Sequence, residues 1–202
     1  NYSLHQFGVG IYYLYMEINF KPTAKQFEMF EKFDDETTLQ CLYGGSVGSA
    51  KSYGLCALVA IKCLQYPGIR VLLSRNELKN LKQTTLVSLT FAVIDEASEV
   101  TRKAQEIVSS RCTRWLNSEY GIKGMVFYTC NPSKSWIYDD FYLPWTTDTL
   151  PEHRVFIQAL PTDNPYLSKD YLNNLKLTLS PAEYHTLVLG KWEFSSDPNQ
   201  LV

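Results

Sequence analysis

Residues 39–53, LQCLYGGSVGSAKSY, combine a short β-prone run, a loop of small residues and a Lys-Ser pair at the start of a helix-prone run. A phosphate-binding loop is built in this order of strand, small-residue loop, Lys-Ser and helix. Glycines let the backbone approach phosphate oxygens, and the unpaired amides at a helix start attract an anion. Lys51 is expected to reach the β- and γ-phosphates, and the Ser52 hydroxyl to bind Mg²⁺. The sequence therefore predicts a polyphosphate-binding loop.

The loop departs from the pattern G-x-x-x-x-G-K-[ST] at one position, because Ala50 stands where the second glycine is expected. Alanine disfavours the positive φ that glycine tolerates. The alternative interpretation is a glycine-rich turn before a helix, with an incidental lysine. The predicted nucleotide-binding residues of the loop are Gly45, Ser46, Val47, Gly48, Ser49, Ala50, Lys51 and Ser52.

Two adjacent acids follow a second apolar run, FAVIDEASEV at residues 91–100. Four apolar residues place Asp95 and Glu96 at the end of a predicted buried strand. Asp95 is expected to hold Mg²⁺ directly or through water, and Glu96 to act as the general base that polarises the attacking water. The alternative is a strand that ends in a solvated acidic turn.

A third apolar run, GMVFYT at residues 124–129, leads into Thr129, Cys130 and Asn131. Polar side chains at the end of a strand beside the loop are placed to sense the γ-phosphate, and losing that contact on hydrolysis can drive a switch. An ordinary Asn-Pro turn is the alternative. Upstream, Thr23 and Gln26 have the spacing of a helix-capping box, and the Gln26 amide also has the donor and acceptor needed to read an adenine edge. Both roles of Gln26 remain open from the sequence.

Composition limits the class of protein. The chain has 202 residues with a net charge of −2, so any nucleic acid is expected to bind a local patch or a ring pore rather than the whole surface. The five cysteines have no paired or zinc-type spacing, and we expect them to be reduced and buried. No run of about 18 apolar residues is present, so no membrane span is expected, and the first residues do not resemble a signal peptide.

The remaining chain is predicted to alternate strands and helices. A strand or hairpin arm is expected at 9–20, a buried strand at 69–74, a polar helix after it, a helix at about 101–116 and a strand at 154–159. Ser168 and Ser180 are expected to cap two short helices, with Gly190 ending the second. We expect an ATPase domain at 1–160, a helical lid or linker subdomain at 161–192, and a linker at 193–202 that leads toward an absent nuclease domain.

Together the phosphate loop, FAVIDEA and YTCNPS resemble the ATPase domain of the large terminase subunit, the DNA-packaging motor of tailed bacteriophages. The resemblance covers residues 22–192 and includes the pattern TDNPYL…YLNNL…LGKW. It implies an α/β fold, namely a RecA-like P-loop NTPase of the additional-strand, catalytic-glutamate class. Such a fold has a central, mostly parallel sheet with helices on both faces and here a small C-terminal helical subdomain. By this resemblance, Lys51 and Ser52 are the Walker A pair, and Asp95 and Glu96 are the Walker B metal-binding residue and catalytic base. Thr129, Cys130 and Asn131 would form the coupling motif. Gln26 would be the glutamine on the adenine side.

The implied function is ATP hydrolysis, with ATP and Mg²⁺ bound, coupled to translocation of double-stranded DNA into a procapsid. The implied partners are double-stranded DNA, a portal protein, a small terminase subunit and further copies of the chain in a ring, although the isolated domain is expected to be monomeric. The implied location is the host cytoplasm, for a virus-encoded protein that is not a stable virion component. Nuclease activity is not expected, because the chain has no cluster of acids suited to two-metal cleavage.

Three departures from the family matter. Besides Ala50, Val47 stands where some terminases have an arginine, so a transition-state arginine must come from elsewhere, from this chain or from a neighbouring subunit. The candidates are Arg75, Arg102, Arg111 and Arg114. The stretch from Lys51 to Asp95 is also short for the family. The competing hypotheses are a helicase-like nucleic-acid-dependent ATPase, a small-molecule kinase, and a non-catalytic module with a decayed site.

Overall fold

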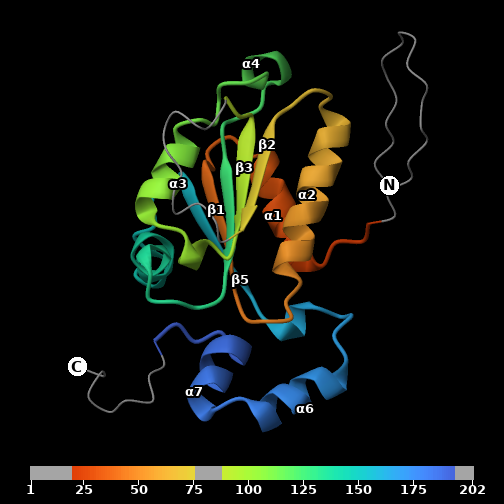
Figure 1. Cartoon of the computed structure of the whole chain (residues 1–202), viewed down its shortest axis with the longest axis vertical. Helices are drawn as coiled ribbons and strands as arrows, with labels where there is room; N and C mark the ends of the chain where they lie inside the picture. The colour runs from red at the N-terminus through yellow and green to blue at the C-terminus, as the bar shows by residue number, and fades with distance from the viewer. Residues whose placement is uncertain (1–19, 76–87, 194–202) are drawn as a thin grey trace.

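The computed structural model describes residues 20–75 and 88–193, which form a parallel sheet with helices on both faces (Figure 1). Within these residues the sheet has five strands in the order β2-β3-β4-β1-β5, and every neighbouring pair is parallel. The strands are β1 (Gln40–Gly45), β2 (Val71–Arg75), β3 (Phe91–Asp95), β4 (Val126–Cys130) and β5 (Arg154–Ala159). The predicted α/β fold is therefore confirmed.

Strand β4 lies between β1, which precedes the phosphate loop, and β3, which ends in the acidic pair. The expected fold class, the additional-strand class, is named after a strand inserted at this position. Parallel strands present their carboxyl ends at one edge of the sheet, and open α/β sheets bind ligands there. All three sequence motifs consequently lie at the same edge.

The strands that carry the motifs are buried on both faces. Every residue of β3 and of β4 is buried, as their continuous apolar runs predict. Helices α1 (Ala24–Asp34) and α2 (Lys51–Gln65) cover one face, and α3 (Arg102–Ser109) lies on the other (Figure 1). Close packing on both faces holds these strands, and with them the residues at their carboxyl ends, in place.

Local signals correctly predicted several element boundaries. Helix α1 begins with the predicted capping box, in which Gln26 N donates to Thr23 Oγ1 over 3.3 Å and Thr23 N donates to Gln26 Oε1 over 2.9 Å. Helix α2 begins at Lys51, as expected, and ends at Gln65. The β-prone run that opens the stretch 39–53 forms β1, and the runs at 69–74 and 124–129 form β2 and β4. Strands β2 and β4 each lie one or two residues further toward the carboxyl end than the runs that predict them.

The helix predicted at about 101–116 is wrong in its second half. Helix α3 ends at Ser109, and the short helix α4 (Asn117–Tyr120) follows a turn in which Thr113 and Leu116 have positive φ values of 70° and 57°. Asn117 Nδ2 donates to the carbonyls of Thr90 and Ile122, each over 3.0 Å. These tertiary bonds beside the start of β3 outweigh the helical propensity of the segment.

Two of the five cysteines also differ from expectation. Cys41, Cys112 and Cys130 are buried as predicted, but Cys56 and Cys63 are exposed. The two lie seven residues apart on α2 and therefore share one face of that helix. An apolar sequence neighbourhood does not specify which face of a helix meets the sheet.

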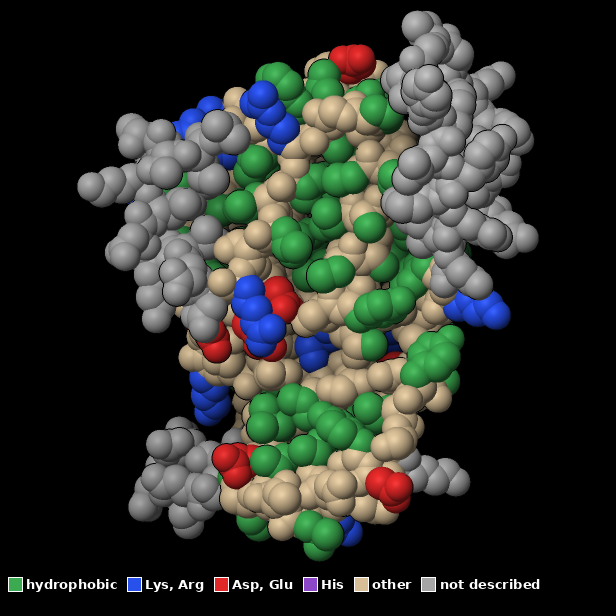
Figure 2. Space-filling view, turned by 45° about the vertical axis from the view of Figure 1, so that its right-hand side comes forward, with side chains coloured by type: hydrophobic (Ala, Val, Ile, Leu, Met, Phe, Trp, Pro, Cys, Tyr) green, Lys and Arg blue, Asp and Glu red, His purple; other side chains and the backbone are tan. Residues whose placement is uncertain are grey.

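The C-terminal helices lie beyond the carboxyl ends of the strands (Figure 1). A π-helical turn (Tyr138–Tyr142) and α5 (Leu143–Thr146) precede β5, and α6 (Lys169–Thr178), α7 (Pro181–Glu183) and a second π-helical turn (Tyr184–Val188) follow it. The predicted caps are confirmed, because the Ser168 and Ser180 hydroxyls accept from Tyr171 N and Glu183 N. Figure 2 shows a furrow between these helices and the rest of the molecule, with Lys or Arg side chains visible in it.

Three predicted segments lie outside the described residues: the strand at 9–20, except for its last residue, the polar helix after β2, and the tail from residue 194. Across residues 20–75 and 88–193, no helix is both long and apolar enough to cross a membrane.

Candidate nucleotide-binding site

The loop between β1 and α2 depends on glycine at its first position. Gly45 has a φ of 136°, and a Cβ placed there would lie 2.2 Å from the carbonyl oxygen of Ala159. No other residue type fits that contact without moving the backbone of β5. Gly48 has a φ of 76°, so it also uses conformational freedom that alanine lacks.

Ala50 adopts the backbone conformation of the glycine it replaces. Its φ of 60° and ψ of 32° are left-handed, and it forms the N-cap of α2 with no side-chain cap bond. The loop therefore takes its shape despite the alanine, with a strain of about 1–2 kcal/mol for an L-residue in this region. The amides at the start of α2 donate to no capping side chain, as suits a site for a phosphate.

We expect Ala50→Gly to stabilise the protein by about 0.5–1 kcal/mol, because relief of the strain exceeds the added entropy of the unfolded chain. Ala60→Gly, at an exposed position inside α2, is the matched control and is expected to destabilise by about 1 kcal/mol. Urea unfolding of both variants measures the difference. Equal destabilisation by the two substitutions would show that Ala50 is not strained.

The Lys51 ammonium is buried against the loop. Its Nζ donates to the carbonyls of Gly45 and Ser46 over 3.0 and 2.5 Å, and to Ser49 Oγ over 3.1 Å. A longer contact of 3.4 Å joins Nζ to Asn131 Oδ1. Burial lowers the pKa of Lys51 to about 8, although nearby Cys130, Glu96 and Asp95 act in the opposite direction. The Lys51 ammonium thus lies inside the loop, and its contact with a phosphate stays a prediction.

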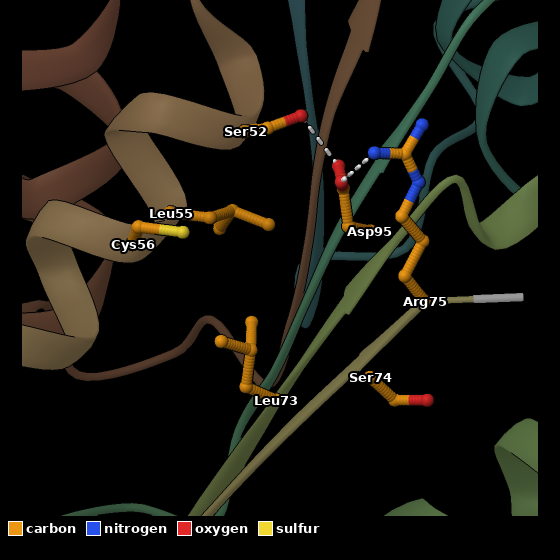
Figure 3. A pocket seen from close by; sticks show the side chains of 7 residues that line it. All are labelled: Ser52, Leu55, Cys56, Leu73, Ser74, Arg75 and Asp95. Carbon is orange, nitrogen blue, oxygen red and sulfur yellow. Dashed lines mark hydrogen bonds and ion pairs between the residues drawn. The ribbon is translucent and has the colours of Figure 1, made fainter.

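The carboxylate of Asp95 faces the start of α2. Ser52 Oγ donates to Asp95 Oδ1 over 2.8 Å, and Thr129 Oγ1 donates to the same oxygen. The second oxygen, Oδ2, lies 3.7 Å from Arg75 Nη1 (Figure 3). The structure therefore brings together the two predicted metal-binding residues.

The oxygen donors at this position fit Mg²⁺. Among the residues described, no three His, Cys, Asp or Glu side chains gather to hold a metal. The protein would therefore offer one hydroxyl and one carboxylate, and Mg²⁺ in such sites completes its shell with substrate phosphates and water. Ser52 and Asp95 provide the oxygen ligands for a Mg²⁺ site of this kind, in which the protein, the phosphates and water share the coordination.

Glu96 and Asn131 lie next to the lysine and the Asp95 carboxylate. Asn131 Nδ2 lies 3.4 Å from Glu96 Oε1, while its Oδ1 faces Lys51, so one amide bridges the predicted base and the loop lysine. Burial raises the pKa of Glu96, with Lys51 and Arg75 opposing the shift. Glu96 has a left-handed φ of 53°, and its amide donates to Thr129 Oγ1 over 3.4 Å. Strained backbone of this kind concentrates at functional sites.

Two further predicted site residues, Cys130 and Gln26, are buried within the protein. Cys130 is fully buried in the core beneath the site, and burial raises the pKa of its thiol. Gln26 is also buried, and its Nε2 donates to the Ala50 carbonyl over 3.0 Å while its Oε1 accepts from Thr23 N. Both ends of the Gln26 amide are thus used within the protein, in the cap and in a link from α1 to the loop. Its adenine-reading role stays a prediction.

Two contacts join the C-terminal segment to the loop and were not predicted from the sequence. Asn164 Nδ2 donates to the Gly48 carbonyl over 2.7 Å, and Val47 N donates to the Leu187 carbonyl over 2.8 Å. Asn164 belongs to the turn TDNP, which follows β5 at the sheet edge that carries the loop. The position of this turn after a strand was the one indication that it could contact the loop, because β5 pairs directly with β1.

The four candidates for the transition-state arginine lie in different parts of the structure. Arg75 lies at the site, whereas Arg102 pairs with Asp140 over 2.7 Å on the far side of the sheet from α2. Leu89 N donates to the Arg111 carbonyl and Arg114 N donates to the Leu89 carbonyl, so both of those arginines lie at the amino end of β3. Of the four candidates, Arg75 is the one that ends a strand beside the acidic pair.

No protein-family model matches the sequence, and no curated protein matches it. Among solved structures, the large terminase of a thermophilic bacteriophage, in complex with ATP-gamma-S, superposes with a TM-score of 0.64 at 13% identity, over 84% of this chain and 52% of that one. The same terminase in complex with ADP gives a TM-score of 0.66 at 12% identity, over 84% and 53%. The Pif1 helicase from Candida albicans gives a TM-score of 0.43 at 15% identity, over 78% and 44%.

This chain has the fold of a large terminase. It spans about half the length of the thermophilic phage terminase. The terminase-like fold agrees with the parallel sheet order and with the strand inserted between the phosphate-loop strand and the acidic strand. The resemblance noted from the sequence motifs is confirmed at the level of the fold.

Proposed function

We propose that this chain is the ATPase motor domain of a viral large terminase, which couples ATP hydrolysis to the movement of double-stranded DNA into a procapsid. The observation that supports it most is the convergence at one sheet edge of Lys51, the Ser52–Asp95 pair and the Glu96–Asn131 pair. A phosphate cradle, a metal position and a general base are the parts that hydrolysis of a nucleoside triphosphate requires.

The chemical step would be attack of a water oxygen on the γ-phosphorus. Glu96 accepts the proton of that water, the new P–O bond forms, and the bond between the γ-phosphorus and the bridging oxygen breaks. ADP leaves with the bonding electron pair, and the products are ADP and inorganic phosphate. Lys51 stabilises charge on the phosphoryl oxygens. Bound Mg²⁺ would supply further charge neutralisation at the phosphates, held near Ser52 and Asp95.

Coupling would begin at Asn131, whose amide faces both Lys51 and Glu96 and is placed to register loss of the γ-phosphate. We propose that residues 161–192 act as a lid, because Asn164 and Leu187 hydrogen-bond directly to the loop. A change in the loop would thereby reach the C-terminal helices without an intermediate element. Partners consistent with this role are double-stranded DNA, a portal protein, a small terminase subunit and neighbouring copies in a ring, in the host cytoplasm.

Steady-state hydrolysis of ATP with Mg²⁺, measured across protein concentrations, tests the proposal. We expect turnover that double-stranded DNA stimulates and that rises faster than linearly with protein, as a ring with shared sites requires. Stimulation by single-stranded DNA alone would favour the helicase-like alternative. Phosphate transfer to a small acceptor rather than to water would favour a kinase. Absence of both nucleotide binding and hydrolysis would overturn the proposal.

A further inference from the structure

Arg75 ends strand β2 directly beside the acidic end of β3. The parallel register pairs Arg75 with Asp95, and paired residues of adjacent parallel strands direct their side chains to the same face of the sheet. Figure 3 shows the guanidinium extending toward the Asp95 carboxylate from the side opposite Ser52. The two side chains therefore approach the same carboxylate from the two flanks of the site.

A cavity of about 240 Å³ joins Arg75 to the start of α2. Ser52, Asp95 and Arg75 line it, together with Leu55, Cys56 and Leu73 (Figure 3). The arginine thus borders the same space as the two side chains with the chemistry for Mg²⁺. A triphosphate held by the loop, with Mg²⁺ at Ser52, would bring its terminal phosphate toward this space.

Arg75 can leave Asp95 for another negatively charged partner at small cost. The Arg75 side chain is 67% exposed while that of Asp95 is 11% exposed, and the atoms are 3.7 Å apart. The hydroxyls of Ser52 and Thr129 already bond to the other oxygen of Asp95. An ion pair as open as this contributes little stability, so the guanidinium can turn to a better acceptor at small cost.

The position of β2 indicates which phosphate Arg75 would meet. Strand β1, which leads into the loop, is separated from β2 by β3 and β4. Lys51 approaches the phosphates from the β1 side, whereas Arg75 approaches from the side of Asp95 and Glu96. Because Glu96 must lie near the γ-phosphorus to act as base, Arg75 lies at the γ end of the triphosphate.

We infer that Arg75 contacts the γ-phosphate of the nucleotide bound to its own subunit. The inference rests on the proposed function and adds to it a residue for ground-state and transition-state recognition supplied in cis. The planar guanidinium offers paired donors that match two phosphate oxygens. A nucleoside diphosphate would leave Arg75 with Asp95, and a triphosphate would draw it away.

The test compares ATPγS and ADP affinities of the wild type, Arg75→Gln and Arg75→Lys by calorimetry, with and without Mg²⁺, at dilution that keeps the chain monomeric. We expect Arg75→Gln to weaken ATPγS binding by about 10- to 100-fold, as for hydrogen bonds to a charged group, and to leave ADP affinity within about twofold. Arg75→Lys should recover part of the lost ATPγS affinity, because lysine keeps the positive charge but not the paired donors of the guanidinium. Arg114→Gln, at the amino end of β3, is the control and should change neither affinity.

Equal weakening of ATPγS and ADP would overturn the inference, since it would indicate a role in shaping the loop. A loss seen only with Mg²⁺ would also overturn it, because Arg75 would then act through the metal position rather than on the phosphate. An unchanged ratio of the two affinities would leave the proposed ATPase intact but not the role of Arg75. A wild-type chain that binds neither nucleotide would overturn the proposed function itself, and the inference with it.

Discussion

Replacing Glu96 with glutamine is expected to lower ATP turnover by about 10³-fold while ATP binding stays close to that of the wild type. Glutamine keeps the size of the side chain and an oxygen that can accept from Asn131 Nδ2, now 3.4 Å from Glu96 Oε1. It cannot take a proton from water. Radioactive ATP hydrolysis and equilibrium binding of ATPγS measure the two quantities separately.

Glu99→Gln is the matched control for this prediction. Glu99 is exposed, lies three residues further on, and donates its amide to the Glu96 carbonyl over 3.0 Å. It has no contact with Lys51 or Asn131 among the hydrogen bonds of the described chain. Turnover in Glu99→Gln should match the wild type. Hydrolysis that survives in Glu96→Gln would show that another group is the base.

The position of Glu96 could be predicted from the sequence, but its backbone conformation and hydrogen bonding could not. The apolar run before it predicts a buried strand, and the strand predicts that two acids emerge at the ligand-binding edge. The left-handed φ of Glu96 and the hydrogen bond from its amide to Thr129 were not predictable, because they depend on how β3 and β4 lie side by side. The residue type at the site follows from the sequence, whereas its orientation follows from strand pairing.

The phosphate loop was predictable because its chemistry is local. Strand, small residues, Lys51 and helix follow one another in the chain, and the one departure, Ala50, lies at a left-handed position, as the pattern requires of the residue it replaces. Contacts between segments that are distant in the sequence were not predictable in this way. Asn164 and Leu187 reach the loop only after β5 has paired with β1, so no short-range pattern reveals them.

Arg75 was one of four arginines that the sequence did not distinguish. Its selection depends on strand order, which places β2 beside β3, and on a register that sets Arg75 opposite Asp95. Neither quantity can be read from residues 69–75 alone. By contrast, the wrong extension of α3 shows a local propensity overruled by tertiary hydrogen bonds from Asn117.

Replacing Lys51 with alanine is expected to weaken ATP binding by about 100-fold, since the ammonium supplies hydrogen bonds to charged phosphate oxygens in a buried setting. Hydrolysis should be lost with it. Lys103→Ala is the control, because the Lys103 side chain is 73% exposed and only faces Glu106 on α3. ATPγS titration of both variants measures the effect, and wild-type affinity in Lys51→Ala would exclude the loop as the phosphate site.

The pH dependence of the wild type follows from the same lysine. Its pKa falls from 10.5 to about 8 because burial disfavours the charged form. Between about pH 8 and 10.5 the unfolded chain holds more protons on this group, so folding stability gains with rising pH over that window, and Lys51→Ala lacks the gain. ATP affinity should move in the opposite direction, because a deprotonated Lys51 no longer attracts phosphate. Binding that stays constant from pH 7 to about pH 9.5 would mean that the charge of Lys51 does not contribute to ATP affinity.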